Sequence, residues 1–274
     1  MTEQTVPPLI PKEGLHVLHL FYTIEYGQWQ LFTKEEQIAA KTKLAALVQE
    51  IRAAEQTQLL MFSIVSPKAD LGFMLLSADL QAANAFEKRL TLALGADVLS
   101  PSYSYFSMTE QSEYASSDDE YAESIMTEKD LKPDSPEFAE EMEQFRTRMA
   151  KYRKDKLYPN LPNWPVFCFY PMSKRRGEVH NWYALPFAER KKLMAGHARV
   201  GRQWHGRILQ LITGSTGLDS MEWGVTLFAH DSFNIKAIIY EMRFDKVSTD
   251  FAEFGDFFIG LQLPLDEIYR RLLL

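Results

Sequence analysis

Residues 168–176, with the sequence CFYPMSKRR, combine an oxidisable tyrosine with a cluster of cations. A hydrophobic run typical of a buried strand ends at Tyr170, and Lys174 follows four residues later. Because strand side chains alternate between two faces, Cys168, Tyr170 and Met172 should share one face, with Lys174 if the strand continues. A tyrosine can act as a general acid or base or as a one-electron donor, and a neighbouring ammonium favours carboxylates. The pattern predicts an anion-binding oxidation site; the alternative is a structural tyrosine followed by a basic loop.

Residues 186–204 predict a helix whose apolar face contains a single histidine. The spacing i, i+4, i+7, i+11 places four side chains on that face: Leu193, His197, Val200 and Trp204. Either His197 is a core histidine bonded to a backbone carbonyl, or it is an axial metal or haem ligand with the macrocycle against the stripe. His205 lies eight residues further on, about 80° out of phase, so it cannot assist His197. Ligation by one histidine favours haem over zinc.

Two further polar residues interrupt apolar runs. Gln210 lies between Ile208 and Ile212 on one strand face. A buried amide is costly unless it is paired, so Gln210 is either held for a ligand or hydrogen-bonded at a wet edge. Arg243 can bind carboxylates with two parallel hydrogen bonds, or it can form an ion pair with Asp245 or Glu241. Phosphate-loop, dinucleotide-binding, zinc-protease, serine-hydrolase and calcium-loop patterns do not occur in the sequence.

Composition narrows the class of protein. The chain has 274 residues, a net charge of −7 and one cysteine, which excludes an intrachain disulfide framework. The acidic balance argues against a general nucleic-acid binder. Residues 165–210 nevertheless carry 9 basic and 2 acidic side chains, a local field suited to a small anionic ligand. Residues 1–12 are polar and no apolar run reaches the roughly 20 residues of a membrane span, so a cytoplasmic protein without membrane attachment is expected.

The chain contains two runs of predicted strands and helices in the same order, and these elements position the residues described above. Residues 1–114 read as strand, helix, strand, strand, helix, strand, and residues 161–274 repeat that order. The first helix should begin at Thr33, which precedes two glutamates as in a capping box. Residues 232–244 read as a helix despite their β-branched side chains. The predicted fold class is α+β, with two ferredoxin-like βαββαβ halves forming a dimeric α+β barrel-type domain pair.

Residues 115–160 separate the two halves. The segment is acidic at first, with a balance of −7 over residues 115–150, and then reads as a helix before a proline-rich end. Its composition predicts a solvated connector without chemistry in its acidic part. At the other end of the chain, residues 250–260 are expected to supply the last strand.

Several strings in the second half resemble the chlorite dismutase-like superfamily, and within it the HemQ-type coproheme decarboxylases. They are CFYPMSKRR, NWYALP, LMAGHARVGR, LQLITGSTGLDSMEWGVTLFA and YEMRFDKVS, in that order, across roughly residues 156–260. The first half resembles the family more weakly, through its strand pattern and SYFSMTEQSEY. The resemblance implies two ferredoxin-like halves and a homopentameric ring. It also implies Fe-coproporphyrin III (coproheme) as substrate and redox centre, hydrogen peroxide as oxidant, and haem b as product through a monovinyl intermediate.

The resemblance also assigns roles to particular residues. His197 is the implied proximal iron ligand, Tyr170 the residue oxidised to a radical, and Lys174 the cation that assists propionate decarboxylation. The implied cofactor-binding residues are Gln210, Arg202, Arg243, Ser248, Lys156 and Met172. Lys156 stands where relatives often have an arginine, which keeps the charge but loses the two-pronged contact. The acidic insertion before it is longer than in typical relatives.

The resemblance leaves two competing functions. A chlorite dismutase or peroxidase would use the same iron ligand, but chlorite dismutases carry a distal arginine where Gln210 stands here. A haem carrier or sensor would need His197 without any use for Tyr170. Transient contact with the coproporphyrin ferrochelatase is a further expectation from the resemblance.

Overall fold

The computed structural model describes residues 7–274, so residues 1–6 of the polar start lie outside the described residues. The N-terminal half contains β1 (His16–Ile24), α1 (Tyr26–Trp29), α2 (Lys34–Ala53), β2 (Thr57–Ile64), β3 (Leu71–Ser77), α3 (Leu80–Thr91) and β4 (Leu99–Thr109). Two connector helices follow, α4 (Asp118–Glu128) and α5 (Pro136–Leu157). The C-terminal half contains β5 (Val166–Lys174), the 3₁₀ turn η1 (Trp182–Ala184), α6 (Phe187–Arg202), β6 (Ile208–Gly214), β7 (Trp223–Ala229), α7 (Ser232–Met242), α8 (Lys246–Phe251), β8 (Ala252–Phe254), β9 (Phe258–Gln262) and α9 (Leu265–Arg271).

The strands form one antiparallel sheet that closes on itself. The strand order is β7-β6-β4-β1-β3-β2-β9-β5-β8, and β5 also pairs with β7. The two halves join at β4–β6 and at β2–β9, so neither half forms a sheet of its own. This arrangement confirms the predicted α+β class with two βαββαβ runs.

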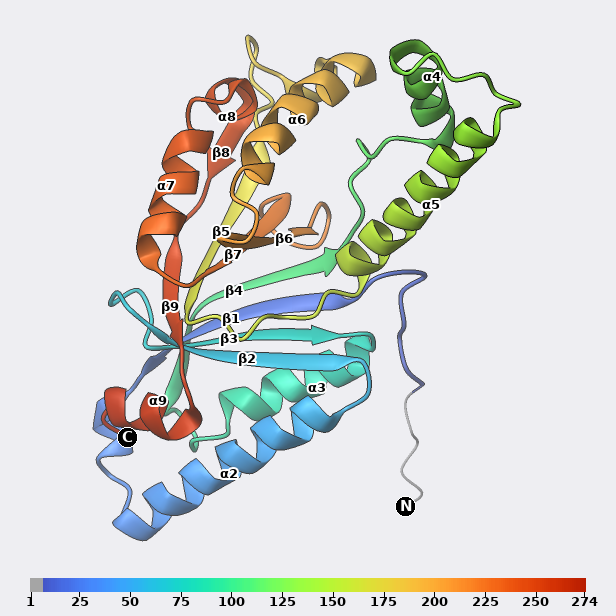
Figure 1. The fold of residues 1–274 in the computed structure, drawn as a ribbon. Coiled ribbons are helices and arrows are strands. Elements are labelled where there is room, and N and C mark those ends of the chain that lie inside the picture. Colours follow the sequence, from blue (N-terminus) through green and yellow to red (C-terminus); the bar gives the residue numbers. More distant parts are fainter. Residues whose placement is uncertain (1–6) are drawn as a thin grey trace.

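Three hydrophobic layers result from the closed sheet. Its interior is filled by inward side chains of both halves, with Phe167 stacked on Phe62 at a centroid distance of 3.9 Å. The helices α2, α3 and α9 cover the outer face of the N-terminal half (Figure 1). The helix α7 and Trp204, which follows α6, pack on the outer face of the C-terminal half, and α6 packs on α7 and α8. Tyr170 and Met172 belong to this last layer.

Local signals account for most of the elements. The Thr33 side chain accepts a hydrogen bond from the Glu36 backbone N–H, and the Glu36 side chain accepts one from the Thr33 backbone N–H. This pair is the predicted capping box of α2. The β-branched run after Asp231 forms the helix α7, because its apolar side chains pack on β7. The predicted last strand is wrong in extent, since Phe251 still belongs to α8 and a break separates β8 from β9.

The connector is more ordered than its composition predicts. The acidic part forms α4, which begins at Ser117 with its own capping box to Glu120. The helices α4 and α5 pack through Tyr121 and Phe145, whose rings stack at 4.1 Å. Glu120 also pairs with Lys191, so α4 is tied to the first turns of α6. Among residues 7–274, no helix combines the length and the apolarity that crossing a bilayer requires.

Candidate active site

Strand β5 supplies one wall of the site. Phe167 and Phe169 point into the closed sheet, while Cys168 and Tyr170 point outward and pack in the layer under α6 and α7. Met172 packs against the same outer layer. The predicted alternation is therefore confirmed as far as Met172, and β5 continues to Lys174.

Tyr170 is 8% exposed and lies in an aromatic pocket. Its ring stacks on Phe257 at a centroid distance of 4.4 Å and contacts Phe254 at 5.9 Å. Burial raises the pKa of the phenol, and the charge of Arg243 offsets only part of that effect. The phenol is therefore protonated at neutral pH, and its hydroxyl forms no hydrogen bond within residues 7–274. Such a tyrosine is packed in one orientation and keeps its hydroxyl available to a ligand.

Lys174 is a buried cation, 8% exposed, at the end of β5. Its Nζ lies 4.6 Å from the centroid of the Trp182 ring, and it forms no ion pair within the part of the chain that is described. Burial lowers its pKa to about 8, against the opposing effects of Asp245 and Glu222. A desolvated ammonium with an aromatic ring on one side is well suited to receive a carboxylate.

Lys174→Met should make the protein more stable to heat, with a gain that depends on pH. The folded pKa of about 8 lies below the ordinary value of 10.5, so burial of the charged form opposes folding at neutral pH. This cost is fully present below about pH 8 and is lost as pH rises toward 10.5. The advantage of Lys174→Met in melting temperature should therefore shrink across that window. Lys192→Met, at an exposed position of α6, is the control, and an equal gain at pH 7 and pH 10 would contradict the expectation.

His197 on α6 supplies the opposite wall. Its Nδ1 lies 2.8 Å from Oδ2 of Asp245, and the two side chains are 24% and 11% exposed. The carboxylate bond excludes the backbone-carbonyl alternative for Nδ1 and fixes the tautomer that presents a free Nε2. Within residues 7–274, Nε2 forms no hydrogen bond. Histidines whose other nitrogen bonds a carboxylate are well oriented and strongly basic metal ligands.

Asp245 connects the two walls. It is the N-cap of α8 and accepts from the Val247 backbone at 3.1 Å, which fixes its carboxylate. The strand β8 follows α8 directly and pairs with β5, with Lys174 opposite Ala252. His197 and Lys174 are therefore held on either side of one short α8–β8 unit.

Three other predicted residues lie on the same side of the sheet. Gln210 is opposite Leu227 in the β6–β7 ladder and shares a strand face with Ile208, which packs in the outer layer. Ser248 is buried in α8, three residues after Asp245. Arg243 ends α7, with its guanidinium 3.7 Å from the centroid of Phe254.

The alternative ion pairs of Arg243 do not form. Asp245 bonds His197, and Glu241 accepts from the indole of Trp204 at 2.8 Å. Arg243 is accordingly a cation without a carboxylate partner among the described residues.

Two predicted residues are not brought to these walls. Arg202 is exposed in the last turn of α6 and forms no ion pair within residues 7–274. Lys156 lies at the end of α5, where its Nζ is 5.8 Å from the Tyr152 ring and burial lowers its pKa. That end of α5 is fixed to the N-terminal half, because Thr109 donates to the Leu157 carbonyl. The roles of Arg202 and Lys156 stay predictions.

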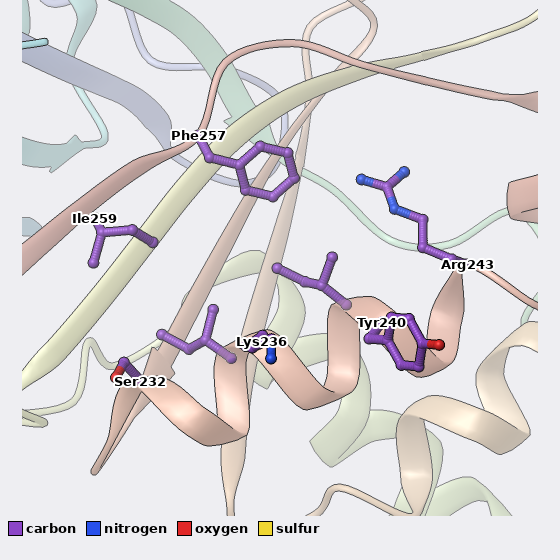
Figure 2. A pocket seen from close by; sticks show the side chains of 8 residues that line it. Ser232, Lys236, Tyr240, Arg243, Phe257 and Ile259 are labelled. Atoms are coloured by element: carbon purple, nitrogen blue, oxygen red, sulfur yellow. The ribbon is translucent and has the colours of Figure 1, made fainter. Parts of the chain in front are cut away.

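A pocket of about 490 Å³ adjoins the site between α7 and β9 (Figure 2). Its lining is mostly apolar, and Ser232 and Arg243 mark its two ends along α7. Phe257 separates this pocket from Tyr170, because the Phe257 ring both lines the pocket and stacks on the phenol. His197 does not line it, so the pocket extends the tyrosine side of the site.

Sequence reasoning missed the residues that hold the predicted ones in place. The sequence suggests Asp245 only as a partner of Arg243, and its bond to His197 spans 48 residues, which no local pattern encodes. Trp182 and Glu222 surround Lys174 but lie in loops whose placement depends on the closed sheet. For Asp245 a local signal exists, since an aspartate before a short helical run is a typical N-cap.

Comparisons with known proteins identify the family of the chain. The sequence model of the chlorite dismutase family matches residues 37–263. A haem-binding protein from Thermus thermophilus superposes with a TM-score of 0.79 at 36% identity, covering 98% of this chain and 99% of that chain. A variant of the chlorite dismutase from Candidatus Nitrospira defluvii gives 0.72 at 16% identity, covering 96% and 97%. The imidazole complex of that enzyme gives 0.71 at 16% identity with the same coverage, and at such identity the fold is what is shared. The chain belongs to the chlorite dismutase family.

Proposed function

We propose that this protein is a coproheme decarboxylase that converts two propionates of Fe-coproporphyrin III to vinyl groups with hydrogen peroxide. One observation carries the proposal. Asp245 orients His197 and its charge also acts on Lys174, a buried and unpaired lysine on the strand that carries the buried Tyr170. A histidine alone would serve a haem carrier, whereas the tyrosine and the lysine are the groups that oxidation of a carboxylate requires.

The residues present fit an iron porphyrin with anionic side chains. His197 offers a free Nε2, and its Nδ1 bond to Asp245 fixes the orientation of the ring. Lys174 and Arg243 are cations without acid partners among residues 7–274, and Arg202 is a third on α6. Such cations suit a porphyrin with four carboxylates better than haem b with two. The 36% identical Thermus thermophilus protein is described as haem-binding, which supports a haem-type ligand here.

The porphyrin iron, when bound and treated with peroxide, supplies two oxidising equivalents for each propionate. Tyr170 gives up an electron and its phenolic proton, and the resulting tyrosyl radical takes a hydrogen atom from the propionate carbon β to the carboxylate. Loss of CO₂ and of one further electron leaves the vinyl group. In sum, one propionate, one peroxide and one proton yield one vinyl, one CO₂ and two waters, and a second round completes the conversion.

The protein groups around Tyr170 determine which part of the substrate reacts. Packing of the phenol between Phe257 and Phe254 fixes the direction of its hydroxyl. The Lys174 ammonium, four residues along the same strand, binds the carboxylate of the propionate that faces Tyr170. This carboxylate is the group that leaves as CO₂. Lys174 therefore positions the leaving group. Gln210, on the adjoining sheet face, contributes a neutral amide where chlorite chemistry employs an arginine.

The test is to load the purified protein with ferric coproheme, titrate hydrogen peroxide and follow the porphyrins by mass spectrometry. We expect the monovinyl intermediate first and haem b after the second equivalent. Intact coproheme after excess peroxide would refute the proposal. Oxygen release from chlorite at enzymatic rates would instead support the chlorite dismutase alternative.

A further inference from the structure

Glu222 is a buried carboxylate next to Lys174 that the mechanism above does not use. It is 6% exposed and lies directly before β7. Its Oε2 accepts from the backbone N–H of Lys174 at 2.7 Å. A buried carboxylate is costly unless its hydrogen bonds and its charge are compensated, so its place here requires a reason.

The first reason lies in the strand ladder. The β5–β7 ladder ends at the pair Met172–Trp223, and the N–H of Lys174 points toward the same side as that of Met172, two residues earlier. No residue of β7 lies opposite Lys174 to accept a hydrogen bond from this N–H. The Glu222 carboxylate accepts it instead. Its own N–H returns a bond to the Met172 carbonyl at 3.0 Å.

The second reason is charge. Besides Glu222, the charged groups around Lys174 are Asp245 on α8, Arg175 and Arg176 on its own chain segment, and Glu253 on β8. Tyr183 and His180 are the other titratable groups of the adjoining loop. Arg176 approaches the other Glu222 oxygen only to 3.8 Å and is largely exposed, so it does not neutralise the carboxylate. Asp245 has the larger effect of the two carboxylates on the pKa of Lys174, and it also bonds His197.

We propose that Glu222 is a positioning residue for Lys174: its carboxylate holds the backbone of the lysine at the end of β5, and it adds one of the two negative charges that act on the ammonium beneath Trp182. This inference rests on the proposed function for the role of Lys174, but the contact between the two residues does not depend on it. In the mechanism, a neutral Lys174 could not bind the carboxylate that is lost, so Glu222 would control the reaction without touching the substrate.

Glu222→Gln separates the two contributions, because its amide oxygen can still accept from the Lys174 backbone while its charge is gone. In the apo-protein, competitive acetylation across a pH series, read by mass spectrometry of the Lys174 peptide, reports protonation of that amine. We expect the midpoint to fall by about one pH unit relative to the wild type. Glu253→Gln removes a nearby exposed carboxylate without contact to Lys174 and should leave the midpoint in place.

Turnover of coproheme provides the second readout. Glu222→Gln should lower kcat for decarboxylation and move its alkaline limb to lower pH, with little change in KM. If the acetylation midpoint moves but the wild type does not decarboxylate coproheme, the proposed function fails and the positioning role stands. An unchanged midpoint in a folded Glu222→Gln protein would overturn the inference.

Glu222→Asp provides a second route if the glutamine variant unfolds. The shorter side chain keeps the charge but withdraws the acceptor from the Lys174 backbone. We expect an acetylation midpoint close to that of the wild type together with reduced kcat. A midpoint lowered by about one unit in Glu222→Asp would contradict the assigned charge effect.

Discussion

Tyr170→Phe is expected to bind ferric coproheme with nearly unchanged affinity and to lose decarboxylation by on the order of 100-fold or more. The phenylalanine ring preserves the stack on Phe257 at 4.4 Å, so the wall of the site keeps its shape. What disappears is the phenolic oxygen, which in the proposed function releases both a proton and an electron to start the reaction. Binding is measured by titration of the Soret band, and conversion by mass spectrometry of the porphyrins after peroxide addition.

Tyr121→Phe is the matched control for that experiment. Tyr121 is also packed against a phenylalanine and also carries a hydroxyl, but it lies between α4 and α5 and bonds Glu141. Its substitution should leave both binding and turnover unchanged. Wild-type yields of haem b from Tyr170→Phe would show that the electron and the hydrogen atom come from another residue.

His197→Ala is expected to weaken coproheme binding on the order of 10- to 100-fold while leaving the affinity for metal-free coproporphyrin III unchanged. The two porphyrins carry the same carboxylates, so their affinity ratio isolates the bond between His197 and iron. Removal of the imidazole also leaves Asp245 without its bond at 2.8 Å, although its bond to the Val247 backbone keeps α8 capped. Fluorescence quenching reports the metal-free porphyrin, and Soret titration the ferric one.

His205→Ala gives the matching control three residues beyond the end of α6, where the side chain is exposed. The affinity ratio of the two porphyrins should be that of the wild type. If His197→Ala reduced both affinities equally, the histidine would support the pocket rather than ligate iron. Added imidazole should restore the ferric spectrum of His197→Ala, since it can occupy the space that the side chain has left.

The sequence predicts the elements better than it predicts their assembly. The capping box at Thr33 and the alternation through Tyr170 are local, and both appear as expected. The closure of the sheet depends on β5 pairing with β7 and on β4 pairing with β6, contacts between segments far apart in the chain. The sequence also contains a signal for α4, because Ser117 and Glu120 form the same capping signature that identifies α2. The acidic composition of this segment instead predicts a solvated connector.

The site shows the same division. Periodicity gives the faces on which Tyr170 and His197 lie, since each face follows from a single element. The groups that orient them do not follow, because the bond from His197 to Asp245 joins α6 to the start of α8. Likewise, Glu222 reaches Lys174 only because the strand β7 begins two residues too late to pair with it. Reactive residues are therefore easier to find in this sequence than the residues that tune them.

The two walls of the site differ in how independently they can open. Strand β5 is bonded on both sides, to β7 along one edge and to β9 and β8 along the other, so its amides are released only when the whole sheet unfolds. Helix α6 buries none of its residues, although Trp204 anchors the turn that follows it. Its local unfolding free energy is correspondingly small. On the proposed function, the wall with the tyrosine is therefore a fixed template, and the wall with the histidine is the side from which the porphyrin enters and which the porphyrin then stabilises.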